Sequence, residues 1–429
     1  MLADSDTRWK WGALTAHRIA PECAAEDGNL TGFLLRGRAT PTARQLGEVG
    51  VRADRLDEVT LPEFLAELRR ERYDMVVLAL VGGAVQAALH GIAALWPEPA
   101  RRPVLVTGYV GVVYEKLADG LLLRHGADLV LANSRHDAGR FRAVYGGVGA
   151  DASAVTETAL PFLDGAPYEE SVGHAHTVVF AAQPSVPESA ADRGYLLRRA
   201  AQHARLHPGR EVLVKLRSKP GEHTTHLEEI PYQRLADRMP DPLPPNLRLV
   251  YGNMGEVLDR TDLLVTVSST AALESLARGI PTAVLTDLGV RETLGNHHFL
   301  GSGCLASWDQ IDAGLRPAGD PAWLAAQGVT SDAPYEAARA RITELLSRPE
   351  LPPPAPYYTA VTAPGYLPGI LARHHLAPDG TVLPGAAKPL HEKSRLRRYL
   401  RSYLREAARG TYRHGVQRVA PVIRRLGEL

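Results

Sequence analysis

The sequence predicts an α/β protein with two doubly wound, Rossmann-like domains that face a cleft. Three observations support this fold class. Short, continuously apolar runs alternate with helical periodicity, the alternation restarts after a break near residue 165, and 429 residues are enough for two domains. Continuous apolar runs are typical of parallel strands that are buried on both faces.

The first half contains three clear strand patterns, each followed by small or polar residues and then by a helical pattern. They are DMVVLAL (74–80), PVLVTGY (103–109) and ADLVLANS (127–134). Only three residues precede Asp4, so a first buried strand there would be unusually short. These elements predict an N-terminal Rossmann-like domain over residues 1–165.

A stretch rich in Pro, Gly and acids (160–174) separates the two halves. The strand patterns then resume, which predicts a second Rossmann-like domain over residues 172–347. Its strands are expected at 177–183, 211–219, 247–252, 262–269 and 282–287.

Composition changes after residue 347. Residues 348–387 are rich in proline and are expected to form an extended linker or strap. Residues 388–429 carry 12 Lys or Arg against three Glu, a local charge of +9, so residues 1–387 carry −8. Within this tail, 395–413 has one apolar stripe flanked by arginines, which is typical of a helix on an anionic membrane surface. Packing on the acidic body or binding RNA are the alternatives, with nucleic acid the less favoured partner.

Several classes of protein are disfavoured by the composition. No stretch approaches the ~20 apolar residues of a spanning helix, and the N-terminus lacks the apolar core of a signal peptide. We therefore expect a cytoplasmic protein, attached to the inner face of the membrane only through its tail. Neither Cys23 and Cys304 nor the histidines at 223–226 and 297–298 form a convincing ligand set, so no metal is expected.

The segment VSSTAALESLARGIP (267–281) follows an apolar strand directly and begins a helix. The hydroxyls of Ser268, Ser269 and Thr270 and the first helical amides are suited to hold a phosphate group. Glu274 lies one turn further and is placed to accept ribose hydroxyls, and Gly279 ends the helix. The alternative is that one of the hydroxyls is simply an N-cap.

With ADSDTRWKWG (3–12), residues 107–134 and TDLGVRETLGNHHFLGSG (286–303), this segment carries a resemblance. The chain resembles two-domain nucleotide-sugar glycosyltransferases of the GT-B type, and in particular uncharacterised actinobacterial glycosyltransferases and, more distantly, bacterial capsule polysaccharide transferases. The spacing of Glu274 from Gly279 and Pro281 is similar to that of the ribose-binding Glu in the enzyme that glycosylates lipid I.

The resemblance implies a metal-independent transfer of a sugar from a nucleotide donor, held by residues 172–347, to a glycan or lipid-linked acceptor, held by residues 1–165. No cofactor is implied beyond the donor itself. Lys215, Arg217 and Lys219 alternate along one predicted strand end, so Lys215 and Arg217, with Arg291 from a later loop, are expected to contact the diphosphate. His207-Pro208 precedes that strand and does not match the His-Pro of the capsule enzymes, which follows it.

An inverting transferase needs a base beside the acceptor hydroxyl. Asp6 and Glu115 are the candidates, and Trp9, Trp11, Gly108 and Tyr109 are expected to contact the acceptor. Two other classes of function remain open. One is epimerisation of a nucleotide sugar or transfer of a polyol phosphate on the same fold, and the other is a non-catalytic scaffold.

Overall fold

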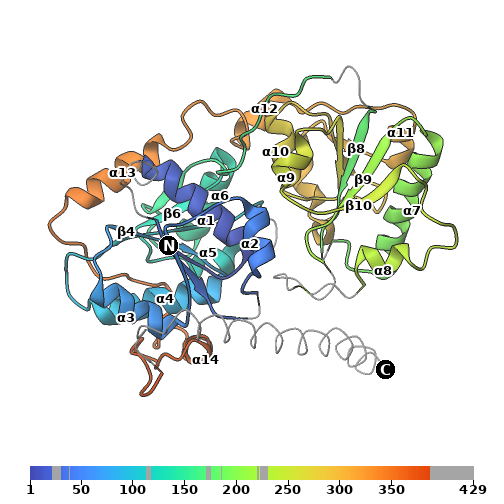
Figure 1. Cartoon of the computed structure of the whole chain (residues 1–429). Helices are drawn as coiled ribbons and strands as arrows, with labels where there is room; N and C mark the ends of the chain where they lie inside the picture. Colours follow the sequence, from blue (N-terminus) through green and yellow to red (C-terminus); the bar gives the residue numbers. More distant parts are fainter. Residues whose placement is uncertain are drawn as a thin grey trace. The chain divides into compact units, whose positions relative to one another are not determined.

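The computed structural model (Figure 1) describes residues 1–21, 30–37, 39–112, 117–170, 175–184, 186–219, 222 and 230–386. It divides into two compact units. We call Met1–Asp164, with the described residues from Pro321 onward, the N-terminal unit, and Gly165–Asp320 the C-terminal unit. Each unit contains one sheet whose strand pairs are all parallel, with helices packed around it, so the predicted α/β class of two Rossmann-like domains is confirmed.

The sheet of the N-terminal unit has the order β3-β2-β1-β4-β5-β6-β7. Its strands are β1 (Leu2–Ala3), β2 (Thr31–Leu35), β3 (Arg55–Val59), β4 (Met75–Ala79), β5 (Val104–Gly108), β6 (Leu129–Ala132) and β7 (Val155–Glu157). The helices are α1 (Asp6–Ile19), α2 (Ala43–Val49), α3 (Leu61–Arg70), α4 (Gly82–Leu95), α5 (Leu117–Leu122), α6 (Arg135–Gly147), α12 (Pro321–Ala326), α13 (Glu336–Ser347) and α14 (Leu367–Arg373).

Strand β1 contains only two residues, as the sequence predicted, yet it lies at the centre of this sheet. Leu2 and Ala3 pair with β2 on one side and with β4 on the other, and both side chains are fully buried. The chain then turns at once into α1, because the Ser5 side chain accepts the backbone N–H of Arg8 as an N-cap. The short strand therefore completes the sheet.

Two apolar cores cover the two faces of the sheet in the N-terminal unit. One includes residues of α3, α4, α6 and α14, such as Phe64, Leu89 and Phe141. The other includes residues of α1 and α13, such as Trp9 and Ile342. Burial on both faces explains why the strands read as continuous apolar runs.

The sheet of the C-terminal unit has the order β10-β9-β8-β11-β12-β13. Its strands are β8 (Thr177–Ala181), β9 (Glu211–Lys215), β10 (Leu247–Val250), β11 (Leu263–Thr266), β12 (Thr282–Leu285) and β13 (Leu305–Ala306). Its helices are α7 (Ala190–Leu206), α8 (Tyr232–Ala236), α9 (Met254–Leu258), α10 (Ala271–Ala277), α11 (Trp308–Asp312) and the 3₁₀ turns η2 (Glu292–Leu294) and η3 (Asn296–Phe299).

The boundary of the second domain differs from the predicted one at 347. The described residues from Pro321 onward, including α12 and α13, belong to the N-terminal unit. The reason is packing: Tyr335, Ile342 and Leu345 are buried in the same apolar core as Trp9. A helical pattern shows that a helix buries one face, and it does not show which domain covers that face.

The proline-rich segment after α13 runs along the N-terminal unit and is tied to it by hydrogen bonds. Leu351 forms an antiparallel bridge with Ala100, and the carbonyl of Tyr358 accepts bonds from the side chains of Gln86 and His90. Helix α14 then packs against α4. The segment therefore acts as a strap on this unit.

Candidate functional site

Each sheet contains one point at which the strand order reverses. In the N-terminal unit the chain builds β1 to β3 on one side and then continues with β4 on the other side of β1. In the C-terminal unit the corresponding reversal lies between β8 and β11. Ligands of open parallel sheets bind beside the carboxyl ends of the strands at such a point.

In the C-terminal unit, Gln183 from the end of β8 and Ser268 from the end of β11 meet at this reversal. The Ser268 backbone N–H donates to Gln183 Oε1 at 2.9 Å, and Gln183 Nε2 donates to Ser268 Oγ at 3.3 Å. The Ser268 hydroxyl in turn donates to the Leu294 carbonyl at 2.6 Å. Ser268 is only 2 % exposed, so its side chain shapes the turn, and the prediction that it contacts a phosphate is corrected.

The turn into α10 retains fewer available amides than the sequence suggested. Ser269 N–H donates to the Thr266 hydroxyl, and Ala271 N–H donates to the Ser269 hydroxyl, both at 3.2 Å. Among the described residues no partner is recorded for the Thr270 amide. Thr270 occupies the N-cap position without a side-chain capping bond. The amide of Thr270 and the half-buried hydroxyls of Ser269 and Thr270 are therefore the groups that this turn offers to a ligand.

Glu274 lies in the first turn of α10, as its spacing predicts. The side chain is 8 % exposed, and its neighbours Ala271, Ala272 and Leu273 are buried. The helix ends where predicted, because Gly279 adopts a positive φ of 76° and the N–H of Ile280 donates to the Ser275 carbonyl. An acid is thus retained in the first turn of a helix whose other residues are Ala, Leu and Ser275, directly behind the turn at Thr270.

The cations that were predicted to share one strand face do not do so. Strand β9 ends at Lys215, so the alternation does not extend to Arg217 and Lys219. Lys215 is 9 % exposed and its Nζ donates to the Leu216 carbonyl at 2.8 Å, which turns it away from solvent. Arg217 is half-buried, and the Lys219 ammonium lies 5.8 Å from the centre of the Tyr251 ring. Of Lys215 and Arg217, which were both predicted to contact the diphosphate, Arg217 is the less buried.

The loop after β12 is built mainly by its own side chains. Asn296 is fully buried, donates to the carbonyls of Leu285 and Gly289, and accepts the backbone N–H of Arg291 at 3.0 Å. Asp287 accepts bonds from Tyr195 and from the backbone of Trp308, so it also has a structural role. The side chain of Arg291 is exposed and remains available to an anion.

In the N-terminal unit, Asp4 bridges the reversal point as Gln183 does in the other sheet. Its Oδ2 accepts the backbone N–H of Val81, which follows β4, and its Oδ1 accepts the Arg8 guanidinium, both at 2.9 Å. The predicted base Asp6 lies two residues further, in the first turn of α1, and is half-buried. The second predicted base, Glu115, lies outside the described residues.

Arg124 organises the loops at this edge and was not singled out from the sequence. Its guanidinium is 5 % exposed and donates to the carbonyls of Gly108, Gly120 and Leu80. It also lies 4.0 Å from the centre of the Tyr109 ring. Burial lowers the pKa of Arg124, and the three carbonyl acceptors together with the ring face stabilise the charge. Tyr109 is thereby held at the edge, half-buried.

Asp137 is a second residue that sequence reasoning missed. It belongs to the first turn of α6, where acids are common, so nothing in the pattern distinguished it. Desolvation raises its pKa to about 6, and Arg140, 3.6 Å away, opposes that shift. Its Oδ1 is buried without a hydrogen-bond partner in the described part of the chain. A carboxyl group with this pKa is suited to exchange protons near neutral pH.

Trp9 and Trp11 do not offer the acceptor an aromatic surface, which corrects the prediction. Each belongs to the buried face of α1, is 1 % exposed and packs in the apolar core on that side of the sheet. A Cβ on Gly108 would lie 2.9 Å from the Trp11 ring and 2.9 Å from the Leu131 carbonyl oxygen. Gly108 is therefore required for this packing and is itself fully covered.

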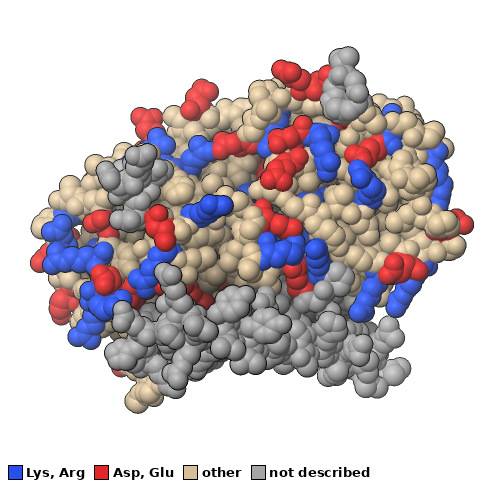
Figure 2. Space-filling model, viewed as in Figure 1, with Lys and Arg blue, Asp and Glu red and all other residues tan. Residues whose placement is uncertain are grey.

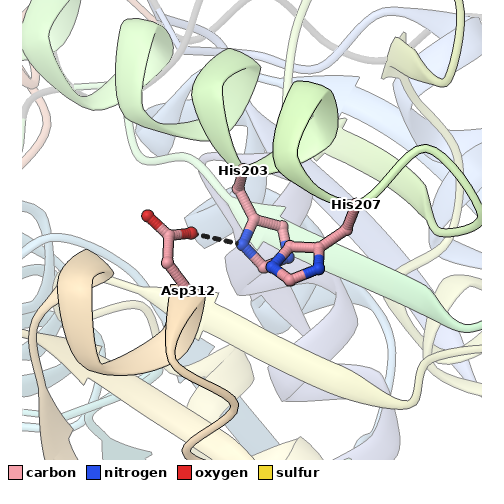
Figure 3. Close-up of side chains that lie close together, drawn as sticks. All are labelled: His203, His207 and Asp312. Carbon is pink, nitrogen blue, oxygen red and sulfur yellow. Dashed lines mark hydrogen bonds and ion pairs between the residues drawn. The ribbon is translucent and has the colours of Figure 1, made fainter.

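His203, His207 and Asp312 are the described residues that come close enough to hold a metal ion, with ligand atoms within 4.8 Å of one another (Figure 3). They extend from the C-terminal end of α7 and from α11, near the amino ends of the strands. His203 Nδ1 lies 2.6 Å from Asp312 Oδ1, and its Nε2 lies 3.3 Å from the Arg210 guanidinium. Both nitrogens of His203 are thus already engaged, as in a structural His–Asp pair.

The family comparison covers both units. Residues 1–345 match the model of the family described as "Putative glycosyltransferase (DUF6716)". The chain belongs to this family. No curated protein matches the chain in sequence.

Solved structures that resemble this DUF6716 protein are distant in sequence. A UDP-GlcNAc 2-epimerase from Neisseria meningitidis, bound to UDP-GlcNAc, is 11% identical, with 81% of this chain and 99% of that chain covered and a TM-score of 0.49. A UDP-GlcNAc 2-epimerase from Methanocaldococcus jannaschii is 9% identical, covering 77% and 96%, also at 0.49. The glycotransferase of kitacinnamycin is 14% identical, covering 90% and 96%, at 0.41.

None of the helices in the described ranges of this family member is both long enough and apolar enough to cross a membrane.

Proposed function

We propose that this protein transfers a sugar from a nucleotide-sugar donor to a glycan or cell-envelope acceptor. The observation that supports this most directly is the family match, which extends over both Rossmann-like units. Two parallel sheets, each with polar residues gathered at its order reversal, suit one site for a nucleotide and one for an acceptor.

We assign the donor to the carboxyl edge of the C-terminal unit. Ser269 and Thr270 would bind the diphosphate through their hydroxyls and the Thr270 amide. Glu274 would accept hydrogen bonds from the ribose hydroxyls. Arg217 and Arg291 would balance the phosphate charge, since guanidinium groups bind phosphate oxygens strongly. With cations in these places the reaction would need no metal ion.

We assign the acceptor to the carboxyl edge of the N-terminal unit. There a carboxylate would remove the proton of the acceptor hydroxyl while the hydroxyl oxygen forms a bond to the anomeric carbon of the donor sugar. The bond between that carbon and the diphosphate breaks, and the nucleoside diphosphate leaves. Asp6 is the candidate that the sequence indicates. Asp137 lies at the start of α6, but its carboxyl group is buried, so Asp6 is retained as the candidate base.

The decisive experiment incubates the purified protein with UDP-, GDP- and CMP-sugars, with and without an oligosaccharide acceptor. Transfer requires that the nucleotide be released only when an acceptor is present and that the acceptor gain the sugar mass. Isomerisation of the donor without an acceptor would establish the epimerase alternative. Absence of nucleotide binding in calorimetry would leave a scaffold and contradict the proposal.

A further inference from the structure

A cavity of about 330 Å³ opens at the amino edge of the sheet in the N-terminal unit, the edge opposite the proposed acceptor residues. Its walls come from the end of α3 and the start of β4 (68–74), the end of α4 and the start of β5 (96–104), and the end of α13 with the strap (345–351). Its volume is within the range of ligand pockets, about 300–1,000 Å³.

The lining of this cavity is rich in arginine. Six arginines and three acids line it, namely Arg69, Arg70, Arg72, Arg101, Arg102 and Arg348 against Glu71, Asp74 and Glu350. Figure 2 shows Lys and Arg side chains, with some Asp and Glu, at the left end of the N-terminal unit, where α3 lies in Figure 1. Arginines therefore outnumber acids in the lining by three, and three of the arginines pair with acids that lie outside it.

Three of these arginines are exposed and form no recorded ion pair with the described residues: Arg69, Arg72 and Arg101. The others are committed elsewhere, Arg70 to Glu67 and Arg348 to Glu344. Guanidinium groups without a carboxylate partner favour a bound anion, because each can donate two parallel hydrogen bonds to a carboxylate or phosphate.

The floor of the cavity is rigid. The buried Arg102 donates to both oxygens of Asp128, at 2.7 and 2.9 Å, and its Nε donates to the Pro352 carbonyl at 2.8 Å. The bridge between Ala100 and Leu351 fixes the strap beside it. These contacts hold the backbone beside Arg101 and the strap in place, so this part of the wall needs little ordering when a ligand binds.

Two aromatic side chains complete the lining. Tyr73 and Trp96 are half-buried against the core and contribute to the cavity wall. Such side chains combine an apolar body with a polar tip. A recessed site that combines aromatic groups with unpaired guanidinium groups matches a ring-shaped, anionic ligand. A membrane surface would instead require several protruding apolar side chains, and Leu346 is the one large apolar lining residue among the exposed ones.

We infer that this cavity is a second carbohydrate site, which binds acidic sugar units of an anionic glycan. The anion site stands on the arginines alone, whereas the choice of a sugar chain rests on the proposed glycosyltransferase function. Such a site would hold the product chain at a distance from the carboxyl edge, so that successive transfers could occur on one bound glycan.

The test is calorimetry of the full chain with tetragalacturonate, using neutral maltotetraose, inorganic phosphate and phosphatidylglycerol vesicles as the other ligands. The test variant is Arg69→Gln/Arg72→Gln/Arg101→Gln. Its control is Arg52→Gln/Arg135→Gln/Arg373→Gln, which removes the same charge from exposed arginines that do not line the cavity. Tetragalacturonate should bind the wild type and the control equally and the test variant on the order of tenfold more weakly.

Equal binding of tetragalacturonate by all three proteins would overturn the inference. So would phosphate binding as tightly as the tetrasaccharide, which would indicate a free-anion site, or vesicle binding that depends on the three arginines without any tetrasaccharide binding. Because these measurements need no catalysis, a protein that transfers no sugar could still pass them, and an active transferase could still fail them.

Discussion

Asp4 and Gln183 occupy equivalent places in the two sheets, and both act through a backbone amide across the order reversal. Asp4 receives the N–H of Val81, and Gln183 receives that of Ser268. Each side chain accepts the hydrogen bond of one backbone amide and thereby ties together the two loops that border the ligand edge. Neither role was evident from the sequence, because the partners are 77 and 85 residues apart.

Glu274→Ala should weaken nucleotide binding by about 1–3 kcal/mol, the loss typical of hydrogen bonds to a charged group. The reason is that the proposed ribose contact is removed while the helix, which favours Ala, persists. Calorimetry with the nucleotide that the wild type binds best provides the measurement. Glu256→Ala on the exposed face of α9 is the control. Normal affinity in the Glu274 variant would reject the ribose assignment.

Asp137 should make the stability of the protein dependent on pH. Its pKa is raised in the folded state, from 3.8 to about 6, so its contribution to the free energy of unfolding is full below pH 3.8 and is lost as the pH rises through 6. The loss is at most about 3 kcal/mol. Asp137→Asn should therefore become more stable than the wild type as the pH rises from 4 to 7.

Urea unfolding at several pH values checks this prediction. Asp151→Asn provides a control of opposite sign, because Ser153 lowers the pKa of Asp151, and the wild-type carboxylate contributes stability only above its pKa. If the free energy of unfolding changes with pH in the same way for the wild type and Asp137→Asn, ionisation of the buried Asp137 does not destabilise the folded protein.

At the scale of elements, helix and strand patterns were predicted well where burial itself creates the pattern. The strands predicted at 74–80 and 177–183 are β4 and β8. Helix α10 ends where Gly279 was predicted to end it, because glycine readily adopts the positive φ found there. The prediction that Lys215 and Arg217 share one strand face was wrong because the sequence does not show that the strand ends at Lys215. The prediction that the tryptophans of α1 contact the acceptor was wrong because sequence alone cannot distinguish an aromatic group that binds sugar from one that fills a core.

Gly108→Ala tests the packing of α1 against β5. The new methyl group would lie 2.9 Å from the Leu131 carbonyl oxygen and from Trp11, and overpacking of this kind costs about 1–3 kcal/mol. The midpoint of thermal unfolding should fall. Gly47→Ala in α2, where nothing lies within 4 Å, should raise it, since Ala is the better helix former by about 1 kcal/mol. A neutral Gly108 variant would mean that α1 can move away from the sheet.

At the scale of the whole molecule, the chain does not divide into domains in sequence order. It enters the C-terminal unit at Gly165 and returns to the N-terminal unit at Pro321. Because the chain returns, α13 packs on the same core as α1. A truncation before residue 321 would remove Tyr335 and expose the groups that it covers, such as the Ala159 carbonyl that accepts its hydroxyl. Helical periodicity predicted α13, and only tertiary packing decides which unit receives it.

The +9 charge at residues 388–429 supports a last prediction, which concerns membranes. Each Lys or Arg near an anionic surface is worth about 1 kcal/mol, and an apolar stripe at 395–413 would add burial. Deleting 388–429 should therefore release the protein from vesicles that contain phosphatidylglycerol, as measured by co-sedimentation, with phosphatidylcholine vesicles as the control. Nucleotide affinity should not change, because the proposed donor residues lie between 217 and 291. If the shortened chain sediments as the full chain does, the tail is not the membrane anchor, and if nucleotide affinity falls as well, the tail contributes to the donor site.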